Sequence, residues 1–267
     1  MTRTVSVLTI AGSDSGGGAG IQADLKTFAA HGVHGLSAIA ALTAQHTRGV
    51  TAVHVPPVEF LVAQIDACFD DFSIGAVKLG MLADAQVIGT VVASLQRYRP
   101  ASIVLDPVMV ATSGAKLLRD DALDALRANL LPLASILTPN LPEAELLLGR
   151  AISDVEDMQR AASELLALGA QAVLLKGGHL AGGDQVVDVY ADAATLRLVR
   201  QPRLQLEAHG TGCSLASAIA ANRCLGMELE TACVAAVAYV HRSLQLGYRP
   251  GRGDVLVLGH FAAAPVA

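Results

Sequence analysis

The sequence predicts a three-layer α/β/α sandwich, in which a mostly parallel sheet lies between two layers of helices. Short apolar runs alternate with longer amphipathic stretches along the 267 residues. The runs are apolar throughout, as expected for strands that are covered on both faces. No segment rich in Ser, Gly and Pro divides the chain, so we expect a single domain over residues 1–267.

Six of the apolar runs are predicted to be buried strands, with amphipathic helices between them. The expected strands are residues 5–11, 36–44, 76–79, 102–105, 135–137 and 172–175. The expected helices are residues 58–69, 85–98, 120–131 and 155–168. Residues 185–190 and 196–200 indicate an antiparallel hairpin at a sheet edge, and residues 212–246 are predicted to be mostly helical.

Composition excludes several classes of protein. Hydrophobic residues make up 52% of the chain, which is enough to exclude disorder. The 19 basic and 24 acidic residues give a net charge of −5, so no nucleic-acid partner is expected. The longest uncharged stretch, residues 27–47, contains three histidines and two glycines, and no membrane span is predicted. The four cysteines lack the spacing of a zinc site or disulfide framework, which favours a cytoplasmic protein.

A glycine-rich loop, residues 12–20, follows the first predicted strand and precedes a helix. Four glycines fall within the five residues 16–20, more than a tight turn requires, although a plain turn remains the alternative. The loop matches neither the P-loop nor the G-x-G-x-x-G pattern. Glycines at such a turn allow a ligand to approach the backbone closely, which predicts a binding loop.

A second glycine-containing segment, His209-Gly-Thr-Gly-Cys213, lies at the start of the C-terminal region that is predicted to be helical. Its backbone N–H groups and the positive end of the helix dipole are suited to an anion. We expect the same position to lower the pKa of the Cys213 thiol, so that a thiolate could accept a proton or attack a carbon. The alternative is that Cys213 is a small buried hydrophobic residue.

Three further polar groups follow predicted strands. Asp106 precedes a proline, Lys176 ends an apolar strand, and Asn140 and Glu143 have the spacing of a capping box. Each has a structural alternative: Asp106 could open a turn, Lys176 could extend to solvent, and the capping box is compatible with a binding role. Because parallel strands end at one edge of a sheet, these groups are expected to converge. Their combination suits phosphoryl transfer.

The sequence resembles the hydroxymethylpyrimidine/phosphomethylpyrimidine kinases of thiamin biosynthesis, which are ribokinase-like enzymes. The resemblance extends over about residues 5–246, and its most specific segments are residues 9–27, 43–45, 78–81, 105–109, 138–143, 175–179 and 209–213. It implies ATP and Mg²⁺ as cofactors and two reactions. The first phosphorylates 4-amino-5-hydroxymethyl-2-methylpyrimidine, and the second converts this monophosphate to the diphosphate.

The resemblance also implies roles for individual residues. Cys213 would be the catalytic base, beside an anion hole formed by Gly210, Thr211 and Gly212. Gln45 would hydrogen-bond the aminopyrimidine edge. The rest of the substrate pocket would be Gly12, Asp24, Thr43, Met81 and Val108. The ATP and magnesium site would be Asp106, Asn140, Glu143 and Lys176, with Asp106 and Glu143 holding the metal through water or phosphate.

Two other functions compete with this interpretation. A pyridoxal or pyridoxine kinase could share the scaffold and Cys213, as a main or side activity. A non-enzymatic pyrimidine-binding module could dispense with Cys213, Lys176 or Glu143, which are all present. The expected partner is a small-molecule substrate, and the family suggests a homodimer whose interface the sequence does not identify.

Overall fold

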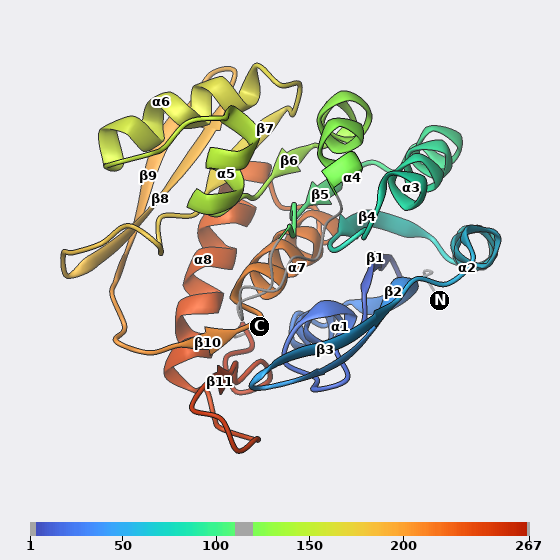
Figure 1. Cartoon of the computed structure of the whole chain (residues 1–267), viewed down its shortest axis with the longest axis horizontal. Coiled ribbons are helices and arrows are strands. Elements are labelled where there is room, and N and C mark those ends of the chain that lie inside the picture. The colour runs from blue at the N-terminus through green and yellow to red at the C-terminus, as the bar shows by residue number, and fades with distance from the viewer. Residues whose placement is uncertain (1–3, 110–119, 266–267) are drawn as a thin grey trace.

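A computed structural model describes residues 4–109 and 120–265. Within these residues, nine strands form one sheet in the order β3-β2-β1-β4-β5-β6-β7-β8-β9 (Figure 1). Their bounds are β1 (Ser6–Gly12), β2 (His34–His46), β3 (Gly49–His54), β4 (Ile74–Leu79), β5 (Ile103–Leu105), β6 (Ile136–Leu137), β7 (Ala172–Leu175), β8 (Gln185–Asp192) and β9 (Leu196–Pro202).

The sheet is parallel from β2 to β7 and antiparallel at both edges. This confirms the six predicted buried strands and the predicted edge hairpin, which is β8 and β9. The sequence did not predict β3, because most of its residues are exposed and it lacks an apolar run. It lies on the β2 edge as an antiparallel hairpin strand.

Helices cover both faces of the sheet, as predicted (Figure 1). One face packs against α1 (Gly20–Ala30), α7 (Thr211–Cys224) and α8 (Leu229–Gln245). The other packs against α2 (Val58–Asp71), α3 (Ala85–Tyr98), α4 (Asp120–Ala125), α5 (Leu141–Leu148) and α6 (Val155–Leu166). After α4 the chain continues through a π-helical turn (Leu126–Leu130) and a 3₁₀ turn (Leu131–Leu133).

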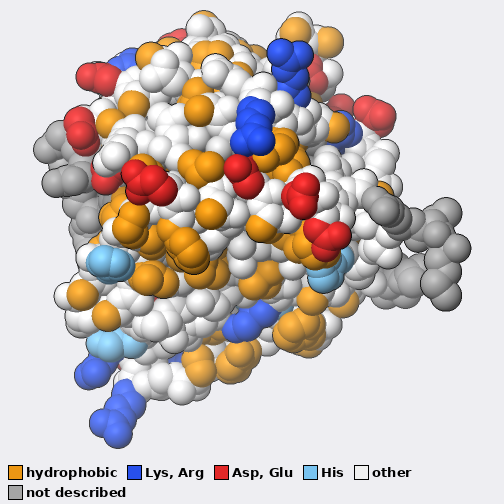
Figure 2. All heavy atoms as spheres, turned by 90° about the vertical axis from the view of Figure 1, so that its right-hand side faces the viewer, with side chains coloured by type: hydrophobic (Ala, Val, Ile, Leu, Met, Phe, Trp, Pro, Cys, Tyr) orange, Lys and Arg blue, Asp and Glu red, His pale blue; other side chains and the backbone are white. Residues whose placement is uncertain are grey.

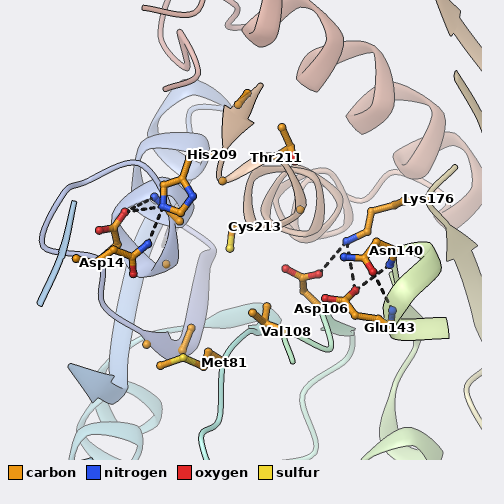
Figure 3. A pocket seen from close by; sticks show the side chains of 18 of the residues that line it. Asp14, Met81, Asp106, Val108, Asn140, Glu143, Lys176, His209, Thr211 and Cys213 are labelled. Carbon is orange, nitrogen blue, oxygen red and sulfur yellow. Dashed lines mark hydrogen bonds and ion pairs between the residues drawn. The ribbon is translucent and has the colours of Figure 1, made fainter. Parts of the chain in front are cut away.

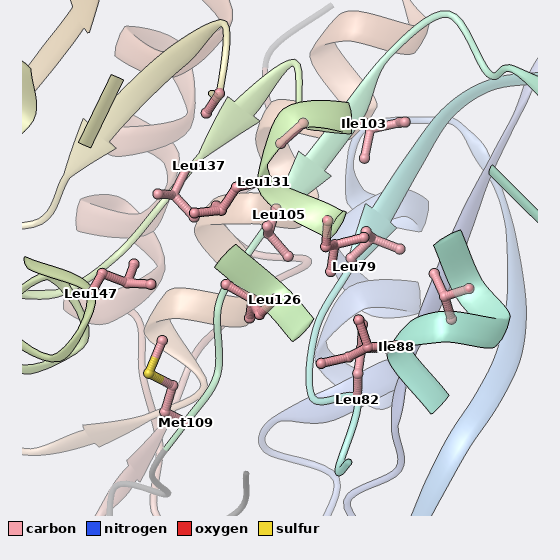
Figure 4. Close-up of a cluster of buried hydrophobic side chains, with 14 of the residues drawn as sticks. Leu79, Leu82, Ile88, Ile103, Leu105, Met109, Leu126, Leu131, Leu137 and Leu147 are labelled. Carbon is pink, nitrogen blue, oxygen red and sulfur yellow. The ribbon is translucent and has the colours of Figure 1, made fainter. Parts of the chain in front are cut away.

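The larger core lies between the sheet and α2 to α6. Strand leucines such as Leu79, Leu105 and Leu137 pack there against Leu126 and Leu147 from the helical layer (Figure 4). Alternate strand residues face the opposite layer and form a second core with α1, α7 and α8. No helix within residues 4–109 and 120–265 has the length and apolar character needed to cross a membrane.

The C-terminal segment returns to the site end of the sheet. Its short strand β11 (Leu256–Val257) pairs in parallel with β10 (Ala208–His209), directly before the glycines that open α7. Beyond β11, the buried His260 lies 2.9 Å from the Ser214 hydroxyl in the first turn of α7. The C-terminal segment therefore contacts β10, which precedes the glycine loop, and α7, which follows it.

Candidate active site

A cavity of about 450 Å³ lies beyond the carboxyl ends of the parallel strands. Figure 3 shows the side chains that converge on it from segments far apart in the sequence. Of the residues that the sequence assigned to the site, thirteen line the cavity and Asp24 does not. The thirteen are Gly12, Thr43, Gln45, Met81, Asp106, Val108, Asn140, Glu143, Lys176, Gly210, Thr211, Gly212 and Cys213.

Lys176 connects the two carboxylates at one end of the cavity. Its Nζ lies 3.1 Å from Asp106 Oδ1 and 4.0 Å from Glu143 Oε2. The strand ends explain this meeting, because the Lys176 N–H donates to Pro139 O and Leu105 of β5 is paired with Leu137 of β6. The predicted convergence of strand-end groups is therefore present at this end.

Asn140 and Glu143 form the predicted capping box at the start of α5. The Glu143 N–H donates to Asn140 Oδ1 at 2.9 Å, and the Asn140 N–H donates to Glu143 Oε2 at 2.8 Å. The same Glu143 oxygen is the one nearest to Lys176. The capping hydrogen bonds thus hold the Glu143 carboxylate next to Lys176. A structural feature of α5 therefore also positions a side chain in the cavity wall.

Burial controls the charges in this cluster. Burial raises the pKa of Glu143 to about 7; Lys176 opposes the rise and Asp106 adds to it. Burial alone would lower the pKa of Lys176, but Asp106 and Glu143 raise it above its ordinary value. The lysine is therefore cationic at neutral pH and available to a phosphate oxygen.

The two glycine loops are in direct contact. Gly210 has φ +82°, and a Cβ there would lie 2.0 Å from Gly18 O. A Cβ on Gly212 would lie 3.0 Å from Lys176 Nζ and 3.5 Å from Asp106 Oδ2. Only glycine leaves the backbone accessible at these two positions. Gly210 is the N-cap of α7 and no side chain caps this helix start, which lies next to the carboxylate–lysine cluster through Gly212.

The environment of Cys213 differs from the sequence expectation. Its thiol was expected to have a lowered pKa, but burial raises the pKa to about 12. Lys78 opposes this rise, whereas Asp106 and Asp24 add to it. The dipole argument was wrong here because it considered only the helix start and not the burial of the thiol, which is the largest cause of the rise, or the neighbouring carboxylates. Burial therefore favours the neutral thiol.

Asp24 was expected in the substrate pocket, and this placement is also wrong. Its side chain is completely buried and forms an ion pair with Lys78, with Nζ 3.0 Å from Oδ2. The hydroxyls of Thr9 and Ser217 donate to the same carboxylate at 2.6 and 2.7 Å. Asp24 thus lies beneath the cavity, whereas its partner Lys78 contributes to the cavity wall.

The other end of the cavity carries an amide and a histidine. Gln45 Nε2 lies 2.7 Å from His209 Nε2, which in turn lies 3.2 Å from Asp14 Oδ2. Burial would raise the pKa of Asp14, but hydrogen bonds from His209 and from the backbone N–H groups of Ala19 and Gly16 lower it. This connected group fixes the orientation of the Gln45 side chain.

Sequence reasoning did not assign Asp14, Lys78 or His209 to the site. Asp14 and His209 lie inside the two glycine motifs, so motif membership was the available signal. Lys78 lies one residue before the end of the buried strand β4, whereas Lys176 directly follows β7, so a criterion that included the last two strand residues would have selected it. A Cβ on Gly12 would lie 2.5 Å from Met81 Cε, so the predicted pocket residues Gly12 and Met81 are in close contact.

A second cavity of about 310 Å³ adjoins the first. The two share wall residues, among them Lys176, Gly178, Thr211 and Gly212. Its other walls are largely apolar and come from the edge hairpin, the following loop, α7 and α8, with the apolar side chains Val186, Pro202, Leu204, Leu206, Leu215, Val237, Val240 and Leu244. An apolar cavity next to an anion-binding loop suits a nucleobase joined to phosphates.

The carboxylates are consistent with Mg²⁺ but not with a closed metal site. The described residues contain no cluster of three or more His, Cys, Asp or Glu side chains able to hold a metal. Mg²⁺ is usually bound by one or two carboxylates, together with water and substrate phosphates. Asp106 and Glu143 supply such a pair beside Lys176.

The fold and this arrangement of groups define a phosphotransferase of the ribokinase-like class. Residues 14–257 match the family described as phosphomethylpyrimidine kinase. The chain is 51% identical over 260 residues to the hydroxymethylpyrimidine/phosphomethylpyrimidine kinase of Rhizobium meliloti, covering 94% of this chain and 96% of that protein. The chain belongs to the phosphomethylpyrimidine kinase family.

Two further comparisons extend this result. The chain is 50% identical over 259 residues to the thiamine biosynthesis bifunctional protein ThiED of Geobacter sulfurreducens, covering 97% of this chain but only 53% of that longer protein. The pyridoxal kinase of Staphylococcus aureus, solved with AMP-PCP and pyridoxal, is 32% identical with a TM-score of 0.89, covering 97% and 94% of the two chains. The ribokinase-like fold that the resemblance implied is confirmed.

Proposed function

We propose that this chain transfers the γ-phosphoryl group of ATP to 4-amino-5-hydroxymethyl-2-methylpyrimidine, and then phosphorylates the monophosphate to the diphosphate. The observation that carries the proposal is the shared wall of the two cavities. Lys176, Thr211 and Gly212 belong to both, so a phosphoryl group held there faces the cavity that contains Gln45 and the two carboxylates on one side, and the cavity lined by α8 and the edge hairpin on the other. The acceptor occupies the first pocket and the nucleobase the second.

Gln45 is the group best suited to recognise the pyrimidine. Its amide offers a donor and an acceptor side by side, which matches an aminopyrimidine edge. The amide is held by contacts at both ends, with Oε1 3.1 Å from the Thr43 hydroxyl and Nε2 2.7 Å from His209. Gly12, Met81 and Val108 complete this pocket.

The carboxylate–lysine cluster and the glycine loop receive the phosphates. Lys176 and the N–H groups of Gly210, Thr211 and Gly212 bind the oxygens on which negative charge lies during transfer. Asp106 and Glu143 would hold Mg²⁺, and the ion would supply charge neutralisation when bound. Asn140 fixes Glu143 through the capping box.

The two reactions differ in what they require of Cys213. In the first, the alcohol oxygen bonds to the γ-phosphorus, the bond from that phosphorus to ADP breaks, and the hydroxyl proton goes to the Cys213 sulfur, which accepts it only in its thiolate form, the form that burial disfavours. In the second, the attacking phosphate is already mostly ionised, because its second pKa is about 6. Cys213 is thus the catalytic base of the first reaction.

A pyridoxal kinase side activity is supported by the similarity to the S. aureus enzyme. An ATP-consumption assay with the pyrimidine alcohol, its monophosphate and pyridoxal side by side tests both proposals. We expect kcat/KM for the two pyrimidines to exceed that for pyridoxal. A larger value for pyridoxal than for both pyrimidines would contradict the assignment.

We also propose a homodimer that works in the cytoplasm. The face carrying β3 and α2 exposes apolar side chains, including Leu42, Val53 and Phe60 at 42%, 45% and 63% exposure. Figure 2 shows hydrophobic side chains spread over this side of the molecule. Light scattering of the chain and of a Phe60→Asp variant tests the assembly: a monomer for the unmodified chain contradicts it.

A further inference from the structure

His209 connects two parts of the site that lie far apart in the sequence. Its side chain is 13% exposed, and its Nε2 atom lies 2.7 Å from Gln45 Nε2 and 3.2 Å from Asp14 Oδ2. Figure 3 shows the ring beside Asp14. The main chain of His209 pairs with Val257 of β11, and a Cβ on Gly18 would lie 2.9 Å from the ring atom Cδ2. The histidine is therefore held in one place by its main chain and by the first glycine loop.

The Asp14 carboxylate acts as an acceptor for several N–H groups. Its Oδ1 accepts the N–H of Gly16 at 2.7 Å, and its Oδ2 accepts those of Gly18 and Ala19 at 2.9 and 2.8 Å. Such hydrogen bonds favour the charged form of a carboxylate, which has no hydrogen to donate. The contact of Oδ2 with His209 Nε2 is therefore favourable only if the ring nitrogen carries a hydrogen. A bare nitrogen would direct its lone pair at a negative oxygen.

Two hydrogen-bond conflicts occur at the Gln45 amide. If His209 Nε2 carries a hydrogen, it has no lone pair for the amide NH2 group 2.7 Å away. At the other end of the amide, the Thr43 hydroxyl has one hydrogen but two acceptors, Ser13 O at 2.8 Å and Gln45 Oε1 at 3.1 Å. Both conflicts have the same origin, because each end of the amide presents the wrong kind of group to its neighbour.

A half-turn of the amide removes both conflicts, since it exchanges the oxygen and the nitrogen without moving the rest of the side chain. The amide oxygen then shares the hydrogen of His209 Nε2 with Asp14, and the amide nitrogen donates to the Thr43 hydroxyl oxygen. We propose that His209, held by Asp14, is a positioning residue that fixes the Gln45 amide in this orientation. This role rests on the proposed function, in which Gln45 recognises the pyrimidine.

The orientation of the amide decides how an aminopyrimidine is seated. The turned amide presents its acceptor on the His209 side and its donor on the Thr43 side. A 4-aminopyrimidine matches this order when its amine lies towards His209 and its ring nitrogen N3 towards Thr43. The 5-hydroxymethyl group is attached next to the carbon that bears the amine, so it also lies on the His209 side. His209 directly precedes Gly210, which lines the cavity, and the reacting hydroxyl is thereby directed towards the anion hole.

The position of the ring hydrogen is the direct test. ¹⁵N NMR of the full chain, labelled at histidine, distinguishes a ring nitrogen that carries a hydrogen from a bare one. The His209 signals are assigned by their absence from His209→Gln and His209→Leu, and correlations with the ring protons identify Nε2. We expect Nε2 to carry a hydrogen at neutral pH without ligand. A bare Nε2 overturns the proposal, whatever the activity of the enzyme.

Steady-state kinetics separate positioning from packing. Glutamine at position 209 supplies N–H donors near the place of Nε2, whereas leucine fills similar space without a donor. We expect His209→Leu to raise KM for the pyrimidine alcohol about tenfold, with KM for ATP within about twofold, and His209→Gln to restore most of this loss. A role in packing alone would disturb the glycine loops in both variants. Equal losses in the two variants, or an unchanged KM for the alcohol in His209→Leu, overturn the proposal.

His46→Leu is the matched control. His46 is an exposed histidine directly after Gln45, and its side chain is not part of the cavity wall. We expect every kinetic constant of this variant to stay within about twofold of the unmodified chain. A tenfold rise in KM for the alcohol there would show that the effect is not specific to His209. If the unmodified chain phosphorylates neither pyrimidine, the proposed function fails, whereas the NMR measurement still decides which group His209 presents to Gln45.

Discussion

Replacement of Lys176 by methionine is the most direct test of the phosphate site. Methionine keeps much of the length of the side chain and removes the ammonium. In the unmodified protein that ammonium is 3.1 Å from Asp106 and 4.0 Å from Glu143. Its removal leaves two carboxylates facing the position where we propose that negative phosphate oxygens bind. The variant therefore loses an attraction and exposes the phosphates to a repulsion.

The size of the effect follows from these distances. With an effective dielectric constant of about 20, the attraction of the ammonium is about 5 kcal/mol for Asp106 and about 4 kcal/mol for Glu143. A phosphate oxygen at either of these two distances from Lys176 Nζ is attracted to a similar extent, before the cost of desolvation is subtracted. Loss of one such donor from an enzyme anion site typically costs about 3–4 kcal/mol. We expect kcat for both substrates to fall about 10²- to 10³-fold.

Lys176→Arg separates charge from shape. The guanidinium keeps the positive charge, but it is a planar fork and not a compact point charge. The space beside Nζ is narrow, because a Cβ on Gly212 would already approach it to 3.0 Å. We expect this variant to retain its thermal stability and lose at least about tenfold in kcat. Full activity in Lys176→Arg, or a loss below about threefold in Lys176→Met, would refute the assignment of this lysine.

Three other predictions follow from the site and its supports. Gln45→Ala should raise KM for the pyrimidine at least about tenfold and leave KM for ATP within about twofold; the reverse pattern would remove Gln45 from the acceptor pocket. Cys213→Asp should lose more activity with the monophosphate than with the alcohol, because a fixed carboxylate repels the phosphate, and the opposite order contradicts this. Burial lowers the pKa of His260 to about 4. Since an unfolded histidine has a pKa of about 6.5, His260 should remove about 2–3 kcal/mol of stability between pH 7 and pH 4.5, and urea unfolding of His260→Gln should show a correspondingly weaker pH dependence.

Sequence patterns predicted the parts of the site that depend on strand ends and local spacing. Asp106 and Lys176 follow buried parallel strands, and such strands end at one edge of the sheet whatever their register. Asn140 and Glu143 are three residues apart, which is sufficient for a capping box. These features depend only on the order of the elements along the chain and on local spacing, so the sequence alone is sufficient to predict them.

Features that depend on contacts between distant segments could not be predicted in this way. Asp24 is buried because α1 packs against α7 and because Lys78, 54 residues later, provides its counter-charge. The motif that contains Asp24 gives no information on which side of the cavity floor it faces. The pKa of Cys213 was mispredicted for a related reason: the local dipole favours the thiolate, but burial and Asp106 outweigh it.

The raised pKa of Cys213 is compatible with two successive phosphorylations at one site. During the second reaction, the acceptor brings a phosphate into the region between Cys213 and the glycine loop. A base with an ordinary carboxylate pKa would be negatively charged there and would repel this acceptor. A thiol with a pKa of about 12 is neutral beside such an acceptor. The same sulfur can therefore remain uncharged beside the monophosphate, whereas it can accept a proton from the alcohol only in its thiolate form. A thiol at this position thus reconciles the proton acceptor of the first reaction with the anionic acceptor of the second.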